Sequence, residues 1–311
     1  MVVEFLLDPL DQELALINLV EGARVDHPIG VLTTYRVGGS AARFVRAINS
    51  DEMRQVATAV AVARTNGNDI PVLVVGRGSN LLVADSGFGG LALQLGPGFD
   101  SVDIDGIEVR VGGAASLPVV ARQSAAAGLT GFEWAVGVPG SVGGAIRMNA
   151  GGHGSDMSAT LMEVSTLDMA TGIERTRPAG ELAFGYRSSI LLPTEVVTSA
   201  NLRLALGGRA SCEKRIEDLV RWRRANQPGG RNAGSVFTNP LGDSAGRLID
   251  TADGRGLRVG TAEVSKKHAN FIQVDEGGSA LDVALLMAEI VRLVHEVHEV
   301  HLEPETVLAG F

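Results

Sequence analysis

The sequence has little cysteine, a deficit of positive charge and no long apolar run, and each shortage excludes or disfavours a class of protein. The single cysteine, Cys212, can form no internal disulfide, and we interpret it as a structural residue. A net charge of -9 disfavours a nucleic-acid binder, whose affinity comes from Lys and Arg against phosphates. No stretch approaches the roughly 18–20 apolar residues that span a bilayer, and the first residues lack the positive charge of a signal peptide. We therefore expect a cytoplasmic protein without nucleic-acid or membrane partners.

Glycine, by contrast, is abundant, with 40 glycines among the 311 residues. A chain of this length favours two or three domains over a single core. Its apolar fraction of 45% and charged fraction of 20% are typical of a globular protein rather than a disordered one. The positions of the glycines are therefore more informative than the overall composition.

Hydrophobic spacing and turn residues predict a mixed α+β chain rather than a regular series of βαβ units. Asn49 and Glu52 form a capping box ahead of a helix, and Asp105–Gly106 and Thr171–Gly172 each favour a tight hairpin turn. We expect further helices over Gln12–Leu19, Leu117–Ala127 (capped by Ser116), Cys212–Ala225, Ala245–Thr251 and Ala280–Val297. We expect strands over Ile70–Val75, Val102–Ile104, Ile107–Val111, Val164–Leu167, Ile173–Arg175 and Ala269–Val274, before an extended tail over Leu302–Leu308.

Two glycine-rich segments carry a pattern typical of ligand binding. Gly76–Leu82 follows a predicted strand, and its glycines allow backbone N–H groups to approach a phosphate, with Ser79 and Asn80 as further donors. It lacks the third glycine of a dinucleotide fingerprint and the Lys-Ser/Thr of a P-loop, so a plain turn is the stronger alternative for this segment alone. Gly137–Gly154 contains seven glycines, which suits backbone packing against a large flat or charged ligand. Because ordering so many glycines costs entropy, a binding role is better supported here.

Two segments place a reactive side chain among small residues. Arg187, within Phe184–Ser189, suits bidentate binding of a carboxylate, although an ordinary surface ion pair is the more frequent role of such an arginine. Ser235, within Asn232–Pro240, has no Gly-x-Ser-x-Gly elbow around it, which disfavours a hydrolase nucleophile. A proton-donating hydroxyl and a turn-capping serine both remain open for Ser235.

The last part of the chain contains polar clusters whose roles stay open. Ser265–Phe271 gathers three polar side chains before a strand, and these are Lys267, His268 and Asn270. Contact with a phosphate or sugar and a solvated basic turn are equally supported for this cluster. Glu305 stands in an otherwise apolar tail, where an acid is either partly buried and functional or simply exposed.

Three histidines recur every three residues near the C-terminus, and these are His295, His298 and His301. Position 299 is Glu, so the His-Glu-x-x-His zinc motif is absent. We therefore expect a polar helix end and no metal site.

The order of these segments along the chain resembles one enzyme family, the UDP-N-acetylenolpyruvoylglucosamine reductases (MurB) of peptidoglycan precursor synthesis. The resemblance runs from about Gly30 to Ala309 and is carried by Thr33–Gly39, Gly76–Val83, Gly137–Gly154, Tyr186-Arg187, Ala233–Pro240, Ser265–Ile272 and Leu302–Glu305. The interval between Arg187 and Ser235 is too short for the extra substrate-clamping loop of one subgroup. The chain therefore resembles the second type of the family, which lacks that loop.

The resemblance implies an α+β fold with a pair of FAD-binding domains of the vanillyl-alcohol-oxidase (PCMH) type and a C-terminal α+β domain that covers the substrate. We expect these three domains over residues 1–95, 96–207 and 208–311. The resemblance further implies that FAD is bound non-covalently and that NADPH is the electron donor. The acceptor is then the enolpyruvyl ether of UDP-N-acetylglucosamine, and we expect a monomer.

The resemblance also assigns roles to individual residues. Arg187 would bind the substrate carboxylate, Glu305 would stabilise the enolate-like charge, and Ser235 would protonate the second carbon. The residues that match the FAD-binding positions are Thr33, Arg36, Gly38, Gly76, Gly78, Ser79, Asn80, Leu81, Pro139, Ser141, Gly144 and Asn149. The residues that match positions near the substrate are Tyr186, Asn239, Lys267, His268 and Asn270.

The chain departs from the family pattern at a few positions. Thr238 stands where many members have Lys, so the cationic contact to the substrate diphosphate is absent or supplied elsewhere. Thr306-Val307 replaces the commoner Val-Arg after Glu305, which changes the local sequence but leaves the acid itself in place. Two other functions remain open from the sequence: another FAD-dependent oxidoreductase of the same superfamily, and a flavin-binding protein without catalysis.

Overall fold

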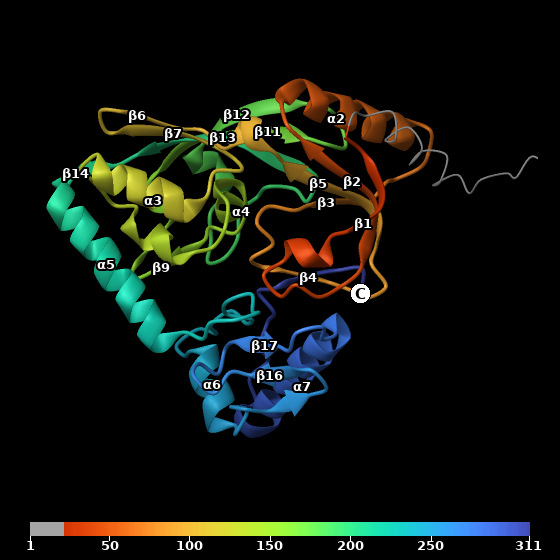
Figure 1. Ribbon diagram of the computed structural model, residues 1–311, viewed down its shortest axis with the longest axis vertical. Helices are drawn as coiled ribbons and strands as arrows, with labels where there is room; N and C mark the ends of the chain where they lie inside the picture. Colours follow the sequence, from red (N-terminus) through yellow and green to blue (C-terminus); the bar gives the residue numbers. More distant parts are fainter. Residues whose placement is uncertain (1–21) are drawn as a thin grey trace, which may run out of the picture.

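The computed structural model describes residues 22–311, which form three units, each built around its own sheet (Figure 1). The helix predicted over Gln12–Leu19 lies outside the described residues. Short 3-10 turns join the larger elements; they are η1 (Gly30–Leu32), η2 (Pro97–Phe99), η3 (Glu133–Gly137), η4 (Met157–Ala159) and η5 (Ala179–Leu182).

The first unit is a four-stranded sheet covered by one helix. Its strand order is β1 (Arg24–Pro28), β2 (Ser40–Ala47), β5 (Phe88–Leu95) and β3 (Val72–Val74). Only β1 is antiparallel to its neighbour; β2, β5 and β3 run parallel. Helix α2 (Ser50–Thr65) packs its apolar face on this sheet, and the Asn49 side chain accepts a hydrogen bond from the Glu52 amide at 2.9 Å. The predicted cap is therefore confirmed, whereas the strand predicted over Ile70–Val75 is shorter than expected.

The second unit is a five-stranded antiparallel sheet. Its strand order is β12 (Glu174–Pro178), β11 (Leu161–Asp168), β13 (Glu195–Arg203), β7 (Glu108–Gly112) and β6 (Val102–Asp105). The β6–β7 and β11–β12 pairs confirm both predicted hairpins. Short paired strands lie beside this sheet; they are β8 (Leu129–Thr130) with β14 (Ala205–Leu206), and β9 (Gly151–Gly152) with β10 (Ser155–Asp156).

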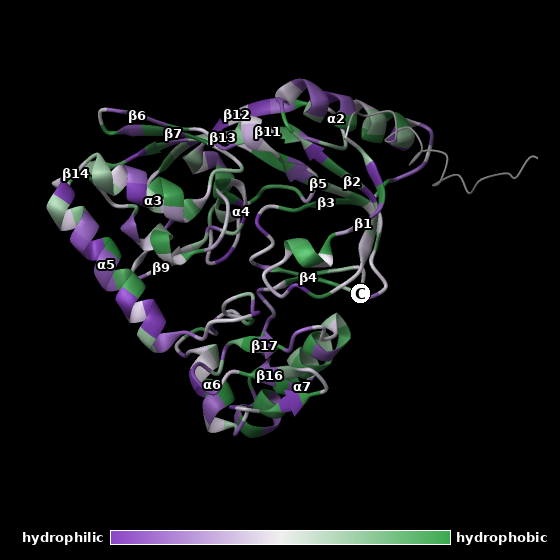
Figure 2. Ribbon diagram, in the orientation of Figure 1, coloured by the Kyte–Doolittle hydropathy of each residue, from purple (hydrophilic) through white to green (hydrophobic). Residues whose placement is uncertain are grey.

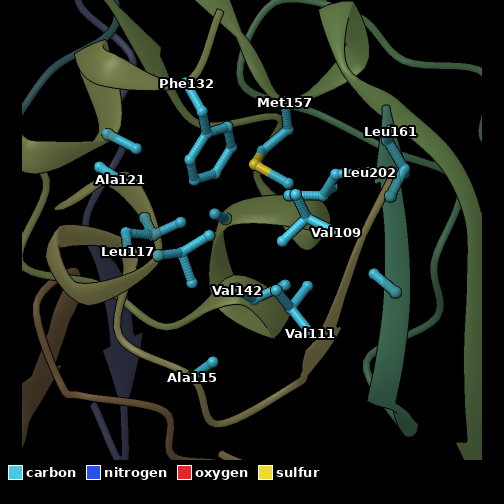
Figure 3. Packing of buried hydrophobic residues seen from close by; sticks show 14 of the residues in the cluster. Val109, Val111, Ala115, Leu117, Ala121, Phe132, Val142, Met157, Leu161 and Leu202 are labelled. Atoms are coloured by element: carbon cyan, nitrogen blue, oxygen red, sulfur yellow. The ribbon is translucent and has the colours of Figure 1, made fainter. Parts of the chain in front are cut away.

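Helices α3 (Leu117–Ala126), α4 (Val142–Arg147) and α5 (Arg209–Asn226) pack on the second unit. Figure 3 shows Phe132 and Met157 facing Val109 and Leu202 of the sheet within this core. Ser116 is the N-cap residue of α3, as predicted, but its side chain makes no capping hydrogen bond; Pro118 occupies the first turn, where a missing N–H costs little.

Helix α5 crosses from the second unit to the third along one side of the molecule (Figure 1). Figure 2 shows polar residues along most of its length. Cys212 and Ile216 are its buried residues, and both belong to the core of the second unit. Cys212 is therefore a packing residue, as predicted, and burial raises the pKa of its thiol.

The third unit packs helices α6 (Ala245–Thr251) and α7 (Ala280–His298) with a small antiparallel sheet of β15 (Arg258–Val259), β16 (Ala262–Val264) and β17 (Ile272–Val274). The apolar face of α7, which includes Val283, Leu286 and Ile290, lies fully buried there. Strand β17 begins at Ile272 rather than at the predicted Ala269, because the Phe271 amide closes a turn on the His268 carbonyl at 3.0 Å.

The tail after α7 returns to the first unit. Residues Val307–Ala309 form β18, which pairs in parallel with β4 (Leu81–Val83) directly after the first glycine-rich segment. The predicted extended tail is therefore confirmed. This pairing brings residues that are far apart in sequence side by side.

The three C-terminal histidines do not converge. The His298 ring lies 2.9 Å from the Thr251 hydroxyl, and His301 lies near Glu303. Within residues 22–311, no group of three or more His, Cys, Asp or Glu side chains is placed to hold a metal ion. In the same part of the chain, no helix has both the length and the apolar character needed to cross a membrane.

We predict that Glu195→Gln lowers the free energy of unfolding by about 3–5 kcal/mol, because it leaves the partner of a buried ion pair uncompensated. Glu195 is 3% exposed, pairs with Arg177, and also accepts a hydrogen bond from the Leu192 amide. Glu108→Gln is the matched control, since Glu108 pairs with Arg203 on the exposed side of the same sheet and should cost less than about 1 kcal/mol. Urea unfolding of both variants measures the difference; equal losses would contradict the prediction.

Candidate active site

A cavity of about 740 Å³ opens where the three units meet. Its wall includes both glycine-rich segments, the turn that carries Arg187, the loop that carries Ser235, and the tail that carries Glu305. The volume is in the range of sites for drug-sized ligands and cofactors, which is about 300–1,000 Å³. The cavity therefore joins segments from all parts of the described chain.

The first glycine-rich segment is packed too closely for side chains. Gly78 has a φ of +62°, and a Cβ there would lie 2.3 Å from the Leu32 carbonyl oxygen. A Cβ at Gly76 would lie 2.7 Å from the Ser141 hydroxyl of the second segment. The two segments thus touch, and together they present a wall made largely of backbone.

The second segment bends sharply at helix α4. The Ser141 hydroxyl accepts a hydrogen bond from the Gly144 amide, which caps the helix, and Gly143 packs on the second-unit sheet with its amide bound to the Gly113 carbonyl. Asn149 has a φ of +38° and donates from its side chain to the Gly185 carbonyl at 3.0 Å. This last bond connects the glycine-rich segment to the turn that carries Arg187.

Arg187 projects from a tight turn between Gly185 and Ser188, whose backbones bond to each other in both directions. Its φ of +56° is unusual for a residue with a side chain and is a strained backbone state typical of functional sites. One guanidinium nitrogen donates to the Gly151 carbonyl at 3.1 Å. The Arg187 Nε atom lies 3.0 Å from Glu305 Oε1 of the tail.

The Arg187–Glu305 ion pair spans two units and is partly buried, with the side chains 22% and 16% exposed. Burial raises the pKa of Glu305 above its ordinary value, and the charge of Arg187 opposes this shift. The backbone of Glu305 is fixed from both sides: its amide donates to the Val236 carbonyl at 2.7 Å, and its carbonyl accepts from the Asn80 side chain at 2.9 Å.

Ser235 lies on the cavity wall in a loop that is fixed by Asn270. The Asn270 carboxamide accepts from the Phe237 amide at 3.0 Å and donates to the Phe237 carbonyl at 2.8 Å. The Val236 amide bonds to the Asn270 carbonyl at 2.9 Å. Asn270 is 4% exposed, so it holds the Ser235 loop in place rather than facing the cavity.

The three residues predicted to be catalytic line the cavity together with most of those predicted to bind the cofactor. The cofactor-site residues on the wall are Gly76, Gly78, Ser79, Asn80, Leu81, Pro139, Ser141 and Gly144. Those that do not line it, among the described residues, are Thr33, Arg36, Gly38 and Asn149.

The residues away from the wall support the glycine-rich segments. The Thr33 hydroxyl donates to the Gly30 carbonyl and accepts from the Arg36 amide, which closes the turn before β2. Gly38 has a φ of +102° and packs directly on the Val83 carbonyl. These contacts fix β4 and the neighbouring first segment.

The five residues predicted near the substrate also lie off the wall of this cavity within residues 22–311. The Asn239 side chain accepts from the Ala245 amide at the start of α6, and the Lys267 ammonium donates to the Arg224 carbonyl at the end of α5. Tyr186 is exposed, with the Arg187 guanidinium 5.1 Å from its ring centre. His268 packs edge-on against Phe271.

Arg223 and Gln227, one turn apart on and after α5, are cavity residues that sequence reasoning missed. Burial lowers the pKa of Arg223, and within residues 22–311 no carboxylate forms an ion pair with it. A Cβ at Gly137 would lie 2.9 Å from the Arg223 side chain, so the glycine makes room for it. The Gln227 Oε1 atom is buried without a partner among the described residues. The pattern Arg-x-x-x-Gln before the Pro-Gly-Gly loop was the available signal.

Two family models match the chain. One is the FAD binding domain, over residues 46–177, and the other is the C-terminal domain of UDP-N-acetylenolpyruvoylglucosamine reductase, over residues 226–309. UDP-N-acetylenolpyruvoylglucosamine reductase 2 of Symbiobacterium thermophilum is 41% identical over 286 residues, which cover 91% of each chain. The reductase of Gloeobacter violaceus is 40% identical over 91% of this chain and 94% of its own.

A solved structure agrees with these relatives. The crystal structure of UDP-N-acetylenolpyruvylglucosamine reductase (MurB) from Thermus caldophilus superposes with a TM-score of 0.79 at 35% identity, and covers 93% of this chain and all of its own. The chain belongs to the UDP-N-acetylenolpyruvoylglucosamine reductase family. The predicted fold class, a PCMH-type FAD-binding part with a C-terminal α+β domain of this family, is confirmed, and so is the predicted FAD.

The residues of this reductase suit FAD. The cofactor is large and flat with a charged diphosphate, and the two glycine-rich segments provide a closely packed backbone wall in which a Cβ at Gly76 or Gly78 would collide. Ser79, Asn80 and Ser141 add polar side chains to that wall. Arg187, Ser235 and Glu305, which are predicted to be catalytic, line the same space.

We predict that Glu305 makes the stability of the reductase fall with pH in a defined window. Its folded-state pKa is raised above the ordinary 4.5, so over the interval between these values the folded chain keeps a proton that the unfolded chain has released. The stabilising contribution is therefore fully present below 4.5 and is lost as pH rises through the folded pKa. Glu305→Gln removes this dependence.

Urea unfolding at a series of pH values measures the contribution of Glu305 as the difference in stability between the wild type and Glu305→Gln. Glu303→Gln, which changes an exposed side chain of the same tail, is the control. A difference that is constant or that grows with pH would show that the sign of the Glu305 shift is wrong.

Proposed function

We propose that this cavity is where the chain carries out the reaction of its family, the NADPH-dependent reduction of UDP-N-acetylglucosamine enolpyruvate to UDP-N-acetylmuramate. The observation that carries the proposal is the Arg187–Glu305 contact of 3.0 Å, which assembles a cation and an acid from two units beside Ser235. FAD supplies, when bound, the transfer of a hydride taken from NADPH to the terminal carbon of the enolpyruvyl group.

Arg187 would bind the carboxylate of the enolpyruvyl group. Addition of hydride to the terminal carbon leaves negative charge on the neighbouring carbon, which is delocalised onto that carboxylate. A guanidinium already placed there lowers the energy of the charged state without reorganisation. The carbonyl of Gly151 and the bond from Asn149 to Gly185 hold Arg187 in its strained turn, so its direction is set before substrate arrives.

Glu305 would act in its protonated form, as a donor to the enolate-like oxygen. The positive charge of Arg187 opposes the raised pKa that burial gives this acid. When Arg187 is occupied by the substrate carboxylate, that opposition weakens, and a second negative charge nearby favours protonation further. Substrate binding would therefore convert Glu305 to the form that the reaction needs.

Ser235 would deliver the proton to the second carbon of the enolpyruvyl group, which completes the saturated lactyl ether. A serine hydroxyl is a weak acid, so its proton must be replaced from a neighbouring group or from water. Asn270 makes the position of this hydroxyl reproducible, because two bonds to Phe237 and one to Val236 fix the loop on its far side.

Arg223 would supply positive charge to an anionic part of a bound ligand. It is the partly buried cation of α5 that faces the cavity, and Gln227 lies one turn further along. A buried cation without a partner is costly, and an anionic ligand group removes that cost. Arg223 therefore gives the cavity a cationic group even though position 238 is Thr rather than Lys.

We further propose a division into domains at residues 1–95, 96–207 and 208–311, with one adjustment. Because residues of helix α5 pack in the core of the second unit, we place this helix in the second domain and start the third domain near residue 226.

We assign the chain to the second type of the family, which lacks the substrate-clamping loop, because strand β13 and helix α5 fill most of the interval from Arg187 to Ser235. We expect it to work as a cytoplasmic monomer.

Measurement of turnover distinguishes this function from another FAD-dependent oxidoreductase and from flavin binding without catalysis. The purified protein is tested for a flavin absorption band and for NADPH oxidation with and without the UDP-enolpyruvyl substrate. Flavin reduction without substrate-dependent turnover would favour another FAD-dependent oxidoreductase. A protein that holds FAD but is not reduced by NADPH would favour flavin binding without catalysis.

We predict that Ser235→Ala leaves the reduction of FAD by NADPH nearly unchanged but slows reoxidation by substrate by about 10²–10⁴-fold, the usual contribution of a positioned proton donor. Stopped-flow absorbance measures the two half-reactions separately. Ser165→Ala, which removes a hydroxyl bonded to Thr176 on the second sheet, is the control. An equal fall in both half-reactions would show that Ser235 is not the proton donor.

A further inference from the structure

Asp85 connects the first unit to the third at a point that the catalytic assignment does not use. It lies two residues after β4, and its carboxylate accepts three hydrogen bonds from the start of α7. The donors are the Ser279 hydroxyl at 2.6 Å, the Ala280 amide at 3.0 Å and the Leu281 amide at 3.1 Å. A residue of one unit thus completes the N-terminus of a long helix in another.

This contact is electrostatically favourable as well as geometrically specific. A carboxylate at a helix N-terminus satisfies amides that have no partner within the helix and interacts with the positive end of the helix dipole. Burial disfavours the charged form, but the three donors hold the pKa of Asp85 below its ordinary value. Asp85 therefore remains charged, and the helix start is bound to the first unit.

The segment Asn80–Asp85 meets the third unit at both of its ends. At one end, Asn80 bonds to the Glu305 carbonyl through its side chain and accepts from the Val307 amide at 3.0 Å. At the other end, Asp85 holds α7. Between them, β4 pairs with β18, and in Figure 1 this strand lies between the first-unit sheet and the third unit.

The apolar packing across this boundary is continuous. Tyr35, Val37 and Leu82 of the first unit lie buried in the same core as the apolar face of α7. Such packing resists separation of the units, but non-directional contacts do not fix their mutual angle. The β4–β18 pairing and the Asn80 bonds lie at one end of this boundary, and the Asp85 carboxylate adds directional hydrogen bonds to α7 at the other end.

We propose that Asp85 is a positioning residue for the reaction: by anchoring α7 to the segment after the first glycine-rich loop, it fixes the angle of the third unit and so holds Glu305 and Ser235 in register with Arg187 across the cavity. This rests on the proposed function. Since a displacement of about 1 Å at a reacting group can cost on the order of 10²-fold in rate, a modest rotation of the third unit is enough to matter.

The test compares Asp85→Ala and Asp85→Asn with Asp103→Ala, an exposed aspartate of β6, as the matched control. In the holoenzyme we expect Asp85→Ala to slow reoxidation by the UDP-enolpyruvyl substrate at least about tenfold. Reduction of FAD by NADPH should change little, because the relative position of Arg187 and Glu305 matters only for the reaction with the substrate. The loss should appear in kcat more than in KM. Asp85→Asn keeps one acceptor oxygen and should be intermediate, and it replaces the alanine variant if that does not fold.

Amide hydrogen exchange gives a readout that does not depend on turnover. Without Asp85 we expect faster exchange at residues 280–282 and also at residues 303–307 around Glu305. Faster exchange at the helix start alone, or a lowered melting temperature with an unchanged reoxidation rate, would reduce Asp85 to a local cap and overturn the proposal. A wild type that is not reoxidised by the substrate at all would overturn the proposed function instead.

Discussion

The architecture of the site depends on one constraint, the parallel pairing of Leu81–Val83 with Val307–Ala309. The first of these strands begins at the end of the glycine-rich segment that suits FAD, and the second begins two positions after Glu305. The three residue pairs of this ladder therefore set the distance between the glycine-rich wall and Glu305. Glu305, whose side chain contacts Arg187 and whose amide bonds to the Val236 carbonyl, lies two residues before this pairing.

The second property of the site is the separation of rigid supports from reactive groups. Asn270 and Asn149 are buried amides that bond to backbone, Asn149 also to the Asp156 carboxylate, and each holds a loop or turn beside one reactive side chain. The reactive side chains themselves are partly exposed and less fully bonded. Such a division keeps geometry constant while the charges of Arg187 and Glu305 remain available to a ligand.

Much of this was predictable from the sequence, and the failures have physical causes. Periodicity gave the helices α2, α3, α6 and α7, and turn residues gave both hairpins, because these signals are local. The family resemblance predicted Arg187, Ser235 and Glu305 to be catalytic, and the structure brings these three residues to one cavity. The resemblance did not separate residues that line the cavity from those that support its wall: Thr33 and Asn270 lie off the wall and bond to backbone, and their roles toward a ligand stay predictions.

Arg223 and Asp85 were not predicted from the sequence, for a related reason. Arg223 lies among many charged residues of a polar helix, and only the packing against Gly137 distinguishes it from its solvated neighbours. Asp85 follows a short strand and has no motif, since its partners on α7 are nearly two hundred positions away. Contacts between distant segments leave no periodic trace, and they are where the sequence is least informative.

The pairing of β4 with β18 also bears on how the molecule reaches its native state. Asn80 and Glu305 are 225 positions apart, so their contact closes one of the longest loops in the chain. Loop-closure entropy must be overcome before such a contact contributes stability, whereas the local hairpins and helices face little of this cost. The local hairpins and helices can thus form before the Glu305 carboxylate reaches the cavity, and completion of the pocket is a late event. Because a ligand that binds only the completed pocket stabilises it by mass action, the supply of flavin in the cell would influence how much of the newly made chain reaches its finished form.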